Sequence, residues 1–307
     1  MEHKHILNVN QFSREDLDEI FVLTTEIQDF FEGDGHQLDP RINLVGNWDE
    51  PLEVPYDYLL ASLFHEASTR TRFSFEAAHQ KLGGTMLSVA DMAGTSSQAK
   101  GETLADTVKT VSQFADIICL RHPEKNAAEK AAEVSNVPII NCGDGSNEHP
   151  TQAILDLYTI WREKETIDGQ NILFFGDIRF ARTIRSLKTL LNLYDVQVEH
   201  ELCFYSQADP GDRGWNDKLK DCDVLYITRA QKERWPSPDA YRLKNIVVSF
   251  AELSKMKEDA IVLHPGPRTG EMNPQIDVDN RVAMWRQVKN GMYVRMALMK
   301  MLLRHSR

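Results

Sequence analysis

A cluster of hydroxyl and cationic side chains follows the first strongly apolar run of the sequence. Residues 58–64 are predicted to form a buried strand, and Ser68, Thr69, Arg70 and Thr71 stand at the start of the next predicted helix. Ligands of open α/β sheets bind beyond the carboxyl ends of the strands. A helix N-terminus presents unpaired N–H groups there, and Arg70 adds a charged, forked donor. The segment indicates a phosphate site, the alternative being a hydroxyl-rich helix cap with a surface arginine.

Four further segments place reactive side chains at comparable positions. Arg121-His122-Pro123 closes another predicted strand, and His149-Pro150-Thr151-Gln152 opens a helix. The run His264-Pro265-Gly266-Pro267-Arg268 closes a strand in the second half, and the loop 95–103 carries Lys100 next to a glycine. Because the carboxyl ends of parallel strands share one edge of a sheet, these groups are candidates for common sites.

The elements that must position these residues alternate between strand and helix. The apolar patterns predict strands at 58–64, 85–90, 116–121, 137–141, 171–175, 196–205, 223–228 and 260–264. They predict helices at 12–31, 69–82, 103–115, 126–134, 149–162, 181–193 and 282–303. Alternation of this kind favours parallel sheets covered by helices on both faces. With the polar stretch 163–170 as a boundary, the sequence predicts two α/β domains with a cleft between them.

Length and composition restrict the classes of function. The chain has 307 residues and a formal net charge of −11, so it is a poor candidate for nucleic acid or an anionic membrane surface. We see no apolar run of about 20 residues and no secretory signal in MEHKHILNVNQFS. The four cysteines show no paired spacing, which is typical of reduced thiols. We therefore expect a cytoplasmic protein.

Taken together, the motifs resemble those of the aspartate/ornithine carbamoyltransferase family, in particular the aspartate-specific catalytic chains. Ser-Thr-Arg-Thr-Arg at 68–72, Lys-Gly-Glu-Thr at 100–103, Arg-His-Pro at 121–123, His-Pro-Thr-Gln at 149–152 and His-Pro-x-Pro-Arg at 264–268 stand in the family's order. The resemblance implies a carbamoyl-phosphate domain at 1–162, completed by a C-terminal helix at about 282–307 that packs back on it. It implies an aspartate domain at 163–281.

The resemblance also implies the reaction and its residues. The chain would transfer the carbamoyl group of carbamoyl phosphate to the amine of L-aspartate, a step of pyrimidine biosynthesis, with no cofactor and no metal. The implied catalytic residues are Arg70, Thr71, Lys100, Arg121 and His149. Carbamoyl phosphate would be held by Ser68, Thr69, Arg70, Thr71, Arg121, His149, Gln152, Pro265, Gly266 and Pro267. Thr71, Arg121 and His149 would donate to the developing oxyanion.

The implied aspartate site is formed by Lys100, Arg182, Arg229 and Gln231. A substrate with two carboxylates needs cationic partners at a fixed separation, and arginine binds carboxylates through two parallel hydrogen bonds. An ornithine-specific relative must accommodate an ammonium group, which a pair of arginines would repel. The resemblance therefore favours aspartate.

In this family the loop around Lys100 belongs to a neighbouring subunit. By resemblance we expect a homotrimer with shared active sites, in which Ser96 and Lys100 are supplied across the interface. The connection 32–56 is longer than expected, and the stretch from Arg182 to Arg229 is shorter than in the best-known bacterial type. The sequence leaves regulatory-chain binding, and any assembly beyond the trimer, open.

Three alternatives stand beside this interpretation. The first is a carbamoyltransferase for another amino-acid acceptor. The second is a catalytically dead, ligand-binding member of the family, against which the joint retention of Lys100, Arg121, His149 and Gln152 argues. The third is a dinucleotide dehydrogenase, for which the Gly-x-Gly-x-x-Gly signature after a strand is lacking.

Overall fold

The structure, a computed structural model, describes residues 4–33, 58–204, 214–237, 241, 243–244 and 246–304. The chain divides into two compact units, the first formed by Met1–Ile154 with Asn290–Arg307 and the second by Leu155–Lys289. The sequence placed the divisions at 162/163 and near 282, within or just before the same two helices. The substrate assigned to each unit stays a prediction. From residue 34 on, the predicted connection 32–56 lies outside the described residues.

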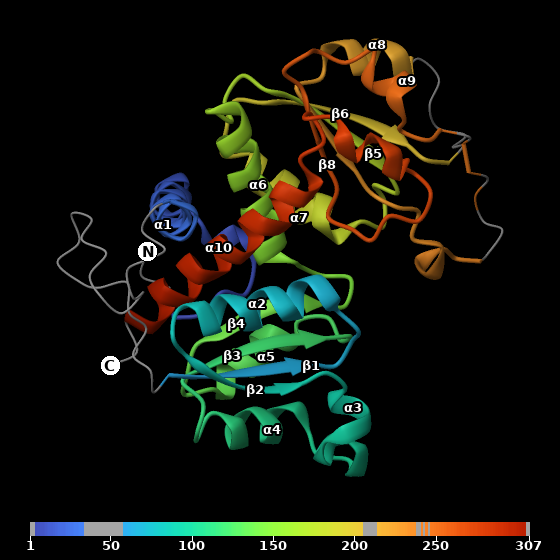
Figure 1. The fold of residues 1–307 in the computed structure, drawn as a ribbon. Coiled ribbons are helices and arrows are strands. Elements are labelled where there is room, and N and C mark those ends of the chain that lie inside the picture. Colours follow the sequence, from blue (N-terminus) through green and yellow to red (C-terminus); the bar gives the residue numbers. More distant parts are fainter. Residues whose placement is uncertain are drawn as a thin grey trace. The chain divides into compact units, whose positions relative to one another are not determined.

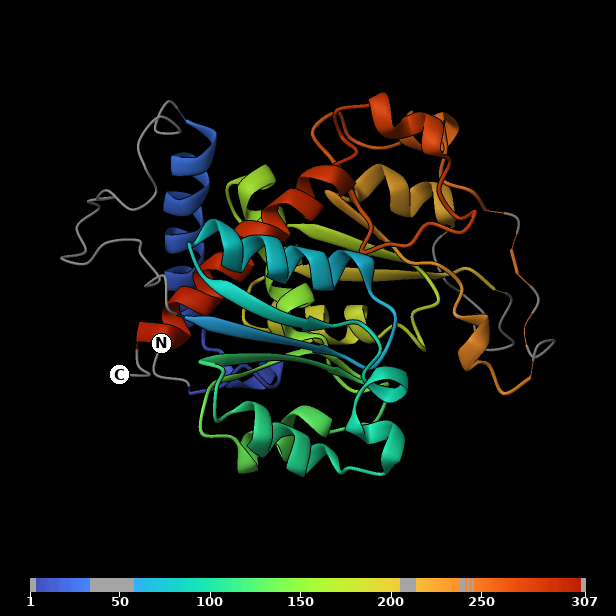
Figure 2. The same ribbon diagram turned by 60° about the horizontal axis from the view of Figure 1, so that its bottom comes forward.

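The first unit is built on a parallel sheet, as predicted. Its strands are β1 (Leu59–Phe64), β2 (Thr85–Val89), β3 (Ile117–His122) and β4 (Ile139–Asp144), in the order β2-β1-β3-β4. Helix α2 (Thr69–Lys81) covers one face, and α4 (Leu104–Val111) and α5 (Ala127–Val134) cover the other (Figures 1 and 2). The apolar side chains of β1 and β3 are buried between these layers, which fixes the positions of the strand ends.

Both ends of the chain contribute helices to the first unit. Helix α1 (Arg14–Glu32) begins at Ser13, whose hydroxyl accepts from the N–H of Asp16 while the Asp16 carboxylate accepts from the N–H of Ser13. This reciprocal pair of hydrogen bonds is a capping box, which fixes the start of the helix. The last helix, α10 (Met284–Arg304), belongs to this unit from Asn290 on. Its Arg295 guanidinium donates to the Ser74 hydroxyl at 2.9 Å, in agreement with the predicted packing of the C-terminal helix on the N-terminal domain.

The second unit repeats the arrangement of the first. Its strands are β5 (Asn171–Gly176), β6 (Gln197–Leu202), β7 (Val224–Ile227) and β8 (Ile261–Leu263), all parallel, in the order β6-β5-β7-β8. Helix α7 (Arg182–Leu191) lies on one face, and α8 (Trp215–Asp221) and α9 (Phe250–Leu253) lie on the other (Figure 1). In each sheet, three neighbouring strands therefore bring their carboxyl ends to one edge: β1, β3 and β4 in the first unit, β5, β7 and β8 in the second.

The differences from the predicted elements are local. Two short helices were not predicted around the loop 95–103. The helix α3 (Met92–Thr95) ends where the loop begins, and the 3₁₀ helix η3 (Ser97–Lys100) lies within it; α8 and α9 were also unpredicted. Short helices of this kind depend on single caps, such as the Asp91 carboxylate that accepts from the N–H of Gly94 at 3.0 Å. The helix predicted at 103–115 ends at Val111. Among the described helices, none combines the length and apolar character of a membrane span.

Candidate active site

The hydroxyl-rich segment after β1 and the arginine at the end of β3 lie side by side. Phe64 pairs with Arg121 in the register of the two parallel strands, and the N–H of His65 donates to the Arg121 carbonyl at 2.9 Å. The Arg121 guanidinium donates to the Ser68 hydroxyl at 3.2 Å and to the Glu66 carboxylate at 3.3 Å. Within this described region, the Ser68 hydroxyl caps no N–H of α2. The first-turn N–H groups thus face the same edge as Arg121.

Two guanidinium groups are held close together at this edge. Partial burial, and then the positive charge of Arg121, lower the pKa of Arg70 below its ordinary value. Like charges at short range repel, and an anion placed between them removes the repulsion. Together with the N-terminus of α2, the two arginines therefore favour a phosphate-sized anion. This electrostatic arrangement is the main observation for a phosphate site.

A second group of buried polar side chains lies at the start of α6 (Pro150–Lys164). His149 is 5% exposed and Gln152 is 9% exposed, and both precede or open the helix that follows β4. Thr71, in the first turn of α2, is also buried. A buried imidazole and amide keep fixed orientations, which suits hydrogen bonds to a small carbonyl compound better than the mobile surface does.

The turn that leads from β4 to His149 is organised by one buried carboxylate, Asp144. Its Oδ2 accepts from the N–H of Asn126 at 2.8 Å and from the side chain of Asn147 at 3.0 Å. Its Oδ1 accepts from the side chain of Asn141 at 2.9 Å and from the N–H of Glu148 at 3.1 Å. Four donors therefore fix the residues immediately before His149. Asp144 is a positioning residue that the sequence reasoning missed.

Asp144→Asn is expected to lower the free energy of unfolding by about 2–4 kcal/mol, because one oxygen becomes an NH₂ group that faces two donors. Urea unfolding of the purified variant measures this loss. Asn147→Ala is the matched control, since it removes one of the four donors and should cost only about 1 kcal/mol. Equal unfolding midpoints for Asp144→Asn and the unchanged protein would contradict the positioning role.

The loop that carries Lys100 is attached to the first unit by its other residues. Ser96 accepts from the N–H of Gln98 at 3.2 Å, and the Gln98 side-chain amide donates to the Thr107 hydroxyl of α4 at 3.3 Å. Gly101 adopts φ +97 and ends η3 directly after Lys100. Lys100 is exposed and has no polar partner among the described residues. Its ammonium is therefore available to a group that the described chain does not contain.

In the second unit, Asp177 connects the ends of β5 and β7. Gly176, with φ +135, is obligatory here because a Cβ would lie 2.1 Å from the Thr228 carbonyl oxygen. The close approach lets the buried Asp177 carboxylate accept from the N–H of Gln231 at 2.8 Å and from the Trp235 indole at 2.9 Å. Asp177 thus fixes the loop that carries Arg229 and Gln231. The sequence reasoning missed this role too, although the glycine before Asp177 was a signal.

The cationic side chains of the second unit differ in their surroundings. Arg182 is the first residue of α7 and is 8% exposed. Arg229 forms a double hydrogen bond with Glu233, one arm of which measures 3.0 Å, and this contact raises the pKa of Arg229 and lowers that of Glu233. Arg234 donates to the carbonyl of Phe180 at 2.9 Å. A dicarboxylate that binds Arg229 on the Nη1–Nη2 side must therefore replace Glu233.

The loop after β8 is held by its own histidine. The imidazole Nδ1 of His264 accepts from the N–H of Gly266 at 2.8 Å, so the ring proton is assigned to Nε2, which donates to Glu271 at 2.7 Å. Gly266 adopts φ +70, and the Gly266–Pro267 peptide bond is cis. The backbone carbonyls of Pro265 and Gly266 are thereby fixed at the end of β8.

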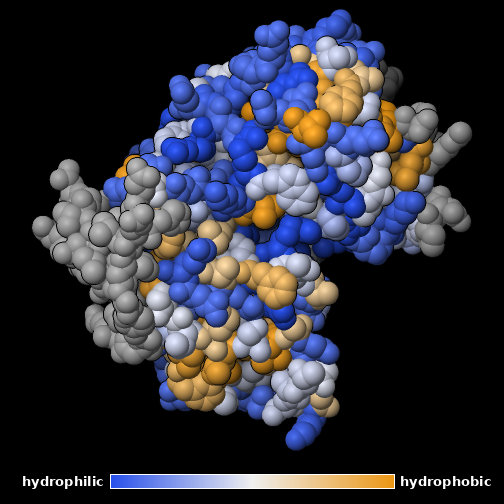
Figure 3. All heavy atoms as spheres, viewed as in Figure 1, coloured by the Kyte–Doolittle hydropathy of each residue, from blue (hydrophilic) through white to orange (hydrophobic). Residues whose placement is uncertain are grey.

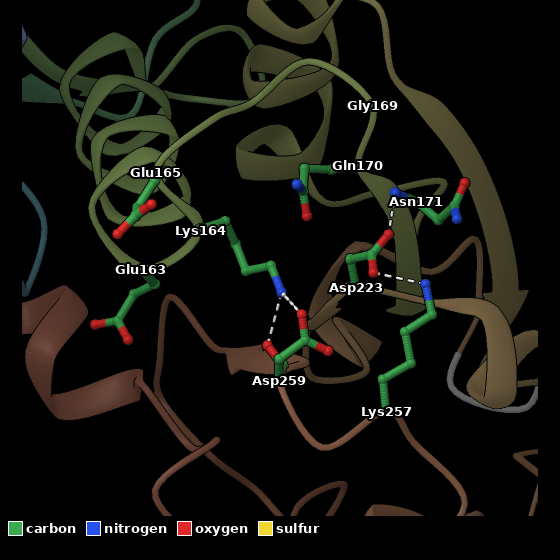
Figure 4. A pocket seen from close by; sticks show the side chains of 9 residues that line it. All are labelled: Glu163, Lys164, Glu165, Gly169, Gln170, Asn171, Asp223, Lys257 and Asp259. Carbon is green, nitrogen blue, oxygen red and sulfur yellow. Dashed lines mark hydrogen bonds and ion pairs between the residues drawn. The ribbon is translucent and has the colours of Figure 1, made fainter.

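A polar pocket lies at the opposite edge of the second sheet (Figure 4). It is lined by residues that precede β5, β7 and β8, where Lys164 pairs with Asp259 at 2.7 Å and Lys257 pairs with Asp223 at 2.6 Å. Arg229 and His264 instead follow the carboxyl ends of β7 and β8. The pocket is therefore separate from the candidate site.

The structure places the predicted residues after neighbouring strands within each unit. In the first unit, the segment 68–71 meets Arg121, and His149 and Gln152 follow the adjacent β4. In the second, Arg182, Arg229, Gln231 and the residues 264–267 follow the adjacent strands β5, β7 and β8. Whether these residues bind the predicted ligands stays a prediction.

Comparison with protein families gives two matches along the chain. The family described as "Aspartate/ornithine carbamoyltransferase, carbamoyl-P binding domain" matches residues 4–162. The family described as "Aspartate/ornithine carbamoyltransferase, Asp/Orn binding domain" matches residues 212–302. The two matches cover most of the chain, in the order that the sequence motifs indicated.

Individual relatives match over almost their whole length. The aspartate carbamoyltransferase catalytic subunit of Leptospira biflexa is 41% identical over 312 residues, which is 97% of this chain and 96% of that protein. The catalytic subunit of M. jannaschii aspartate transcarbamoylase superposes with a TM-score of 0.81 at 35% identity, covering 98% of both chains. Aspartate transcarbamoylase from Trypanosoma cruzi, in complex with carbamoyl phosphate and aspartate, gives a TM-score of 0.80 at 31% identity, with 96% and 95% covered. The same enzyme was also solved with N-(phosphonacetyl)-L-aspartic acid, at a TM-score of 0.79 and 32% identity over 97% and 95% of the two chains.

Proposed function

Because this chain belongs to the aspartate/ornithine carbamoyltransferase family, we infer that it transfers the carbamoyl group of carbamoyl phosphate to the amine of L-aspartate. The products are N-carbamoyl-L-aspartate and phosphate, in de novo pyrimidine biosynthesis. The observation that carries the proposal is the pair Arg70 and Arg121 beside the N-terminus of α2. The positive charge of one lowers the pKa of the other, so binding of an anion at this position is favourable.

We propose that the first unit binds carbamoyl phosphate. Ser68, Thr69, Arg70 and Thr71 hold its phosphate together with Arg121, and Gln152 holds the carbamoyl amide. The carbonyls of the loop 265–267, which belongs to the second unit, are proposed as further acceptors for this amide. Thr71, Arg121 and His149 donate to the carbonyl oxygen. The burial of Thr71, His149 and Gln152 supports this assignment, since donors in a dry, rigid setting stabilise an oxyanion best.

The second unit is proposed to bind aspartate through Arg182, Arg229 and Gln231, with Lys100 as a further cation. The neutral amine attacks the carbonyl carbon, the resulting tetrahedral oxyanion collapses, and the bond from carbon to the phosphate oxygen breaks. The departing phosphate takes the amine proton, so no covalent enzyme intermediate is needed. Most of the rate acceleration comes from positioning and electrostatics.

The chain is proposed to form a homotrimer whose active sites are shared between subunits. The exposed Lys100 supports this, because its charge has no polar partner in the described part of its own chain. Exposed apolar side chains on the first unit, Phe73, Leu87 and Phe114, support association, and apolar surface is visible on this unit in Figure 3. Ser96 and Lys100 then act in the site of a neighbour.

Mixing two inactive variants is expected to restore activity. In randomly exchanged trimers of Lys100→Ala and His149→Ala chains, about a quarter of the sites receive both intact residues, because each site draws on two neighbouring chains. The two variants are dissociated together, reassembled and assayed, with separately treated variants as the control. Sizing of the same sample decides the trimer. Reassembled mixtures no more active than the separate variants would rule out shared sites.

We place the protein in the cytoplasm. Cys119, Cys142, Cys203 and Cys222 are all buried and free, which supports a reducing compartment. Burial raises the pKa of Cys203 and Cys222 to about 12, so these thiols stay protonated and chemically quiet.

Calorimetric titration with N-(phosphonacetyl)-L-aspartic acid tests the proposed site, because this compound joins a phosphonate to an aspartate. We expect one molecule per chain, with the affinity reduced about a hundredfold or more by either Arg121→Met or Arg182→Met, since each removes a charged hydrogen-bonding partner. Undiminished affinity in both variants would contradict the assignment.

A further inference from the structure

One buried carboxylate of the second unit is used by no step of the proposed reaction. Asp156 lies in α6 and is fully buried. Its Oδ2 accepts from the Tyr226 hydroxyl and its Oδ1 accepts from the side-chain amide of Gln287, both at 2.6 Å. Because both oxygens accept from strong donors, the group has the bonding pattern of an ionised carboxylate. Burying such a charge is costly, so a specific role is to be expected.

The hydrogen bond from Gln287 connects Asp156 to the loop after β8. Gln287 is 1% exposed, and its side-chain oxygen accepts from the backbone N–H of His264 at 2.9 Å. The amide is therefore oriented at both ends, with its NH₂ toward Asp156 and its oxygen toward His264. His264 in turn binds the N–H of Gly266. The conformation of the loop 264–267 is thus connected to Asp156 through one side chain.

The hydrogen bond from Tyr226 connects Asp156 to the vicinity of the first turn of α7. Tyr226 is fully buried in β7, and the side chain of Thr183, in the first turn of α7, lies beside its hydroxyl. Burial and the Asp156 carboxylate raise the pKa of Tyr226 well above its ordinary value, so the hydroxyl keeps its proton and remains a donor. Thr183 directly follows Arg182. The backbone that carries Arg182 is thus connected to the same carboxylate.

We propose that Asp156 is a positioning residue, which fixes the loop 264–267 through Gln287 and the first turn of α7 through Tyr226. On α6, Asp156 follows Gln152 by four residues, a spacing that places both on one helix face, and His149 directly precedes the helix. The helix α6 therefore carries Gln152, which is proposed to contact carbamoyl phosphate, and Asp156, which accepts hydrogen bonds from Tyr226 and Gln287. The inference rests on the proposed function for the identity of the substrates.

Loss of the Gln287 connection and loss of the Tyr226 connection are expected to have different kinetic effects. Gln287→Met frees the loop 264–267 and should raise the KM for carbamoyl phosphate about tenfold, while Tyr226→Phe should raise the KM for aspartate by a comparable factor. Leu253→Ala, a truncation in the core of the same unit, is the control for lost stability. It should lower the melting temperature without changing the ratio of the two KM values. The proposal would be overturned if Gln287→Met and Tyr226→Phe, like Leu253→Ala, lowered the melting temperature without changing the ratio of the two KM values.

A reciprocal exchange provides a test that does not depend on truncation. Gln287→Glu alone places two buried carboxylates opposite each other and should be severely impaired. In the double variant Asp156→Asn/Gln287→Glu, the glutamate still accepts from the N–H of His264, and the new asparagine donates to the glutamate and accepts from Tyr226. We expect the double variant to regain most of the activity lost by Gln287→Glu. A double variant as impaired as Gln287→Glu would overturn the proposal.

Amide hydrogen exchange separates this inference from the proposed function, because it requires no turnover. Exchange at the His264 and Gly266 amides should quicken about tenfold in Gln287→Met, and exchange in the first turn of α7 should quicken in Tyr226→Phe. Unchanged exchange at both segments would overturn the positioning role. Absence of turnover by the unchanged protein, with these exchange differences present, would instead contradict the proposed function alone.

Discussion

Arg121→Met is expected to lower kcat/KM for carbamoyl phosphate by about 10³-fold or more, the largest loss of any single substitution considered. Arg121 is held at the end of β3 by its hydrogen bonds to Glu66 and Ser68, 16% of its side chain being exposed. It is assigned both a phosphate contact and a contact to the developing oxyanion. Its removal therefore deletes ground-state binding and transition-state stabilisation together. Initial-rate measurements over a range of carbamoyl phosphate concentrations give the value.

Arg72→Met is the matched control for this substitution. Arg72 lies in the same first turns of α2 and has a similar side-chain exposure of 21%, but it pairs with Glu76 at 3.5 Å and stacks on Phe73. It should lose little activity, whereas added guanidinium ion should partly restore Arg121→Met. Comparable losses in the two variants would mean that general stability of α2, rather than an anion site, explains the result.

His149→Ala is expected to lower kcat by about 10²–10³-fold, the usual cost of removing one oxyanion donor. His149 is buried at the start of α6 and follows a turn that Asp144 fixes through four donors, so its ring has little freedom to move. His149→Gln keeps a donor in a similar position and should lose less. Steady-state kcat of both variants is compared with that of the unchanged protein.

The pH profile separates a donor from a general base at this position. If His149 acts only as a hydrogen-bond donor, the acidic limb of the kcat profile should persist in His149→Gln, because that limb then reports the titration of another group. A general base predicts that this limb disappears with the imidazole. Near-normal turnover of His149→Ala over the whole range would remove both roles.

The sequence predicted the residues that face the ligands better than those that hold them in place. Arg70, Arg121 and His149 follow strand ends in recognisable motifs, so the parallel topology alone gathers them at one edge. Asp144 and Asp177 gave weaker signals, because an isolated aspartate after a strand is equally typical of a turn. Their roles depend on donors that the fold supplies from other segments, such as Asn126 for Asp144 and Trp235 for Asp177.

Asp156 shows the limit of local reasoning most clearly. Tyr226 and Gln287, which donate to it, are 70 and 131 residues away in the sequence, on β7 and α10. Helical or strand periodicity cannot indicate a contact at that separation. In the sequence, Asp156 is only one polar residue in an otherwise apolar stretch of a predicted helix. The same limit explains the unpredicted α3, α8 and α9, whose few residues show no periodic pattern; side-chain caps stabilise α3 and α9, and buried Leu219 anchors α8.

The net charge of −11 constrains macromolecular partners but not the substrates proposed here. A small anion responds to the local field, and the first unit places Arg70 and Arg121 close enough for one charge to lower the pKa of the other group. An acidic surface around such a cationic site is compatible with anionic substrates.

The central claim is tested most directly by identifying the carbamoylated product. The purified protein is incubated with carbamoyl phosphate and, in separate reactions, L-aspartate, L-ornithine or L-glutamate, and each mixture is resolved by mass spectrometry. We predict N-carbamoyl-L-aspartate with stoichiometric phosphate release in the first reaction, and background levels in the other two. Carbamoylation of ornithine or glutamate in preference to aspartate, or of no acceptor at all, would contradict the account.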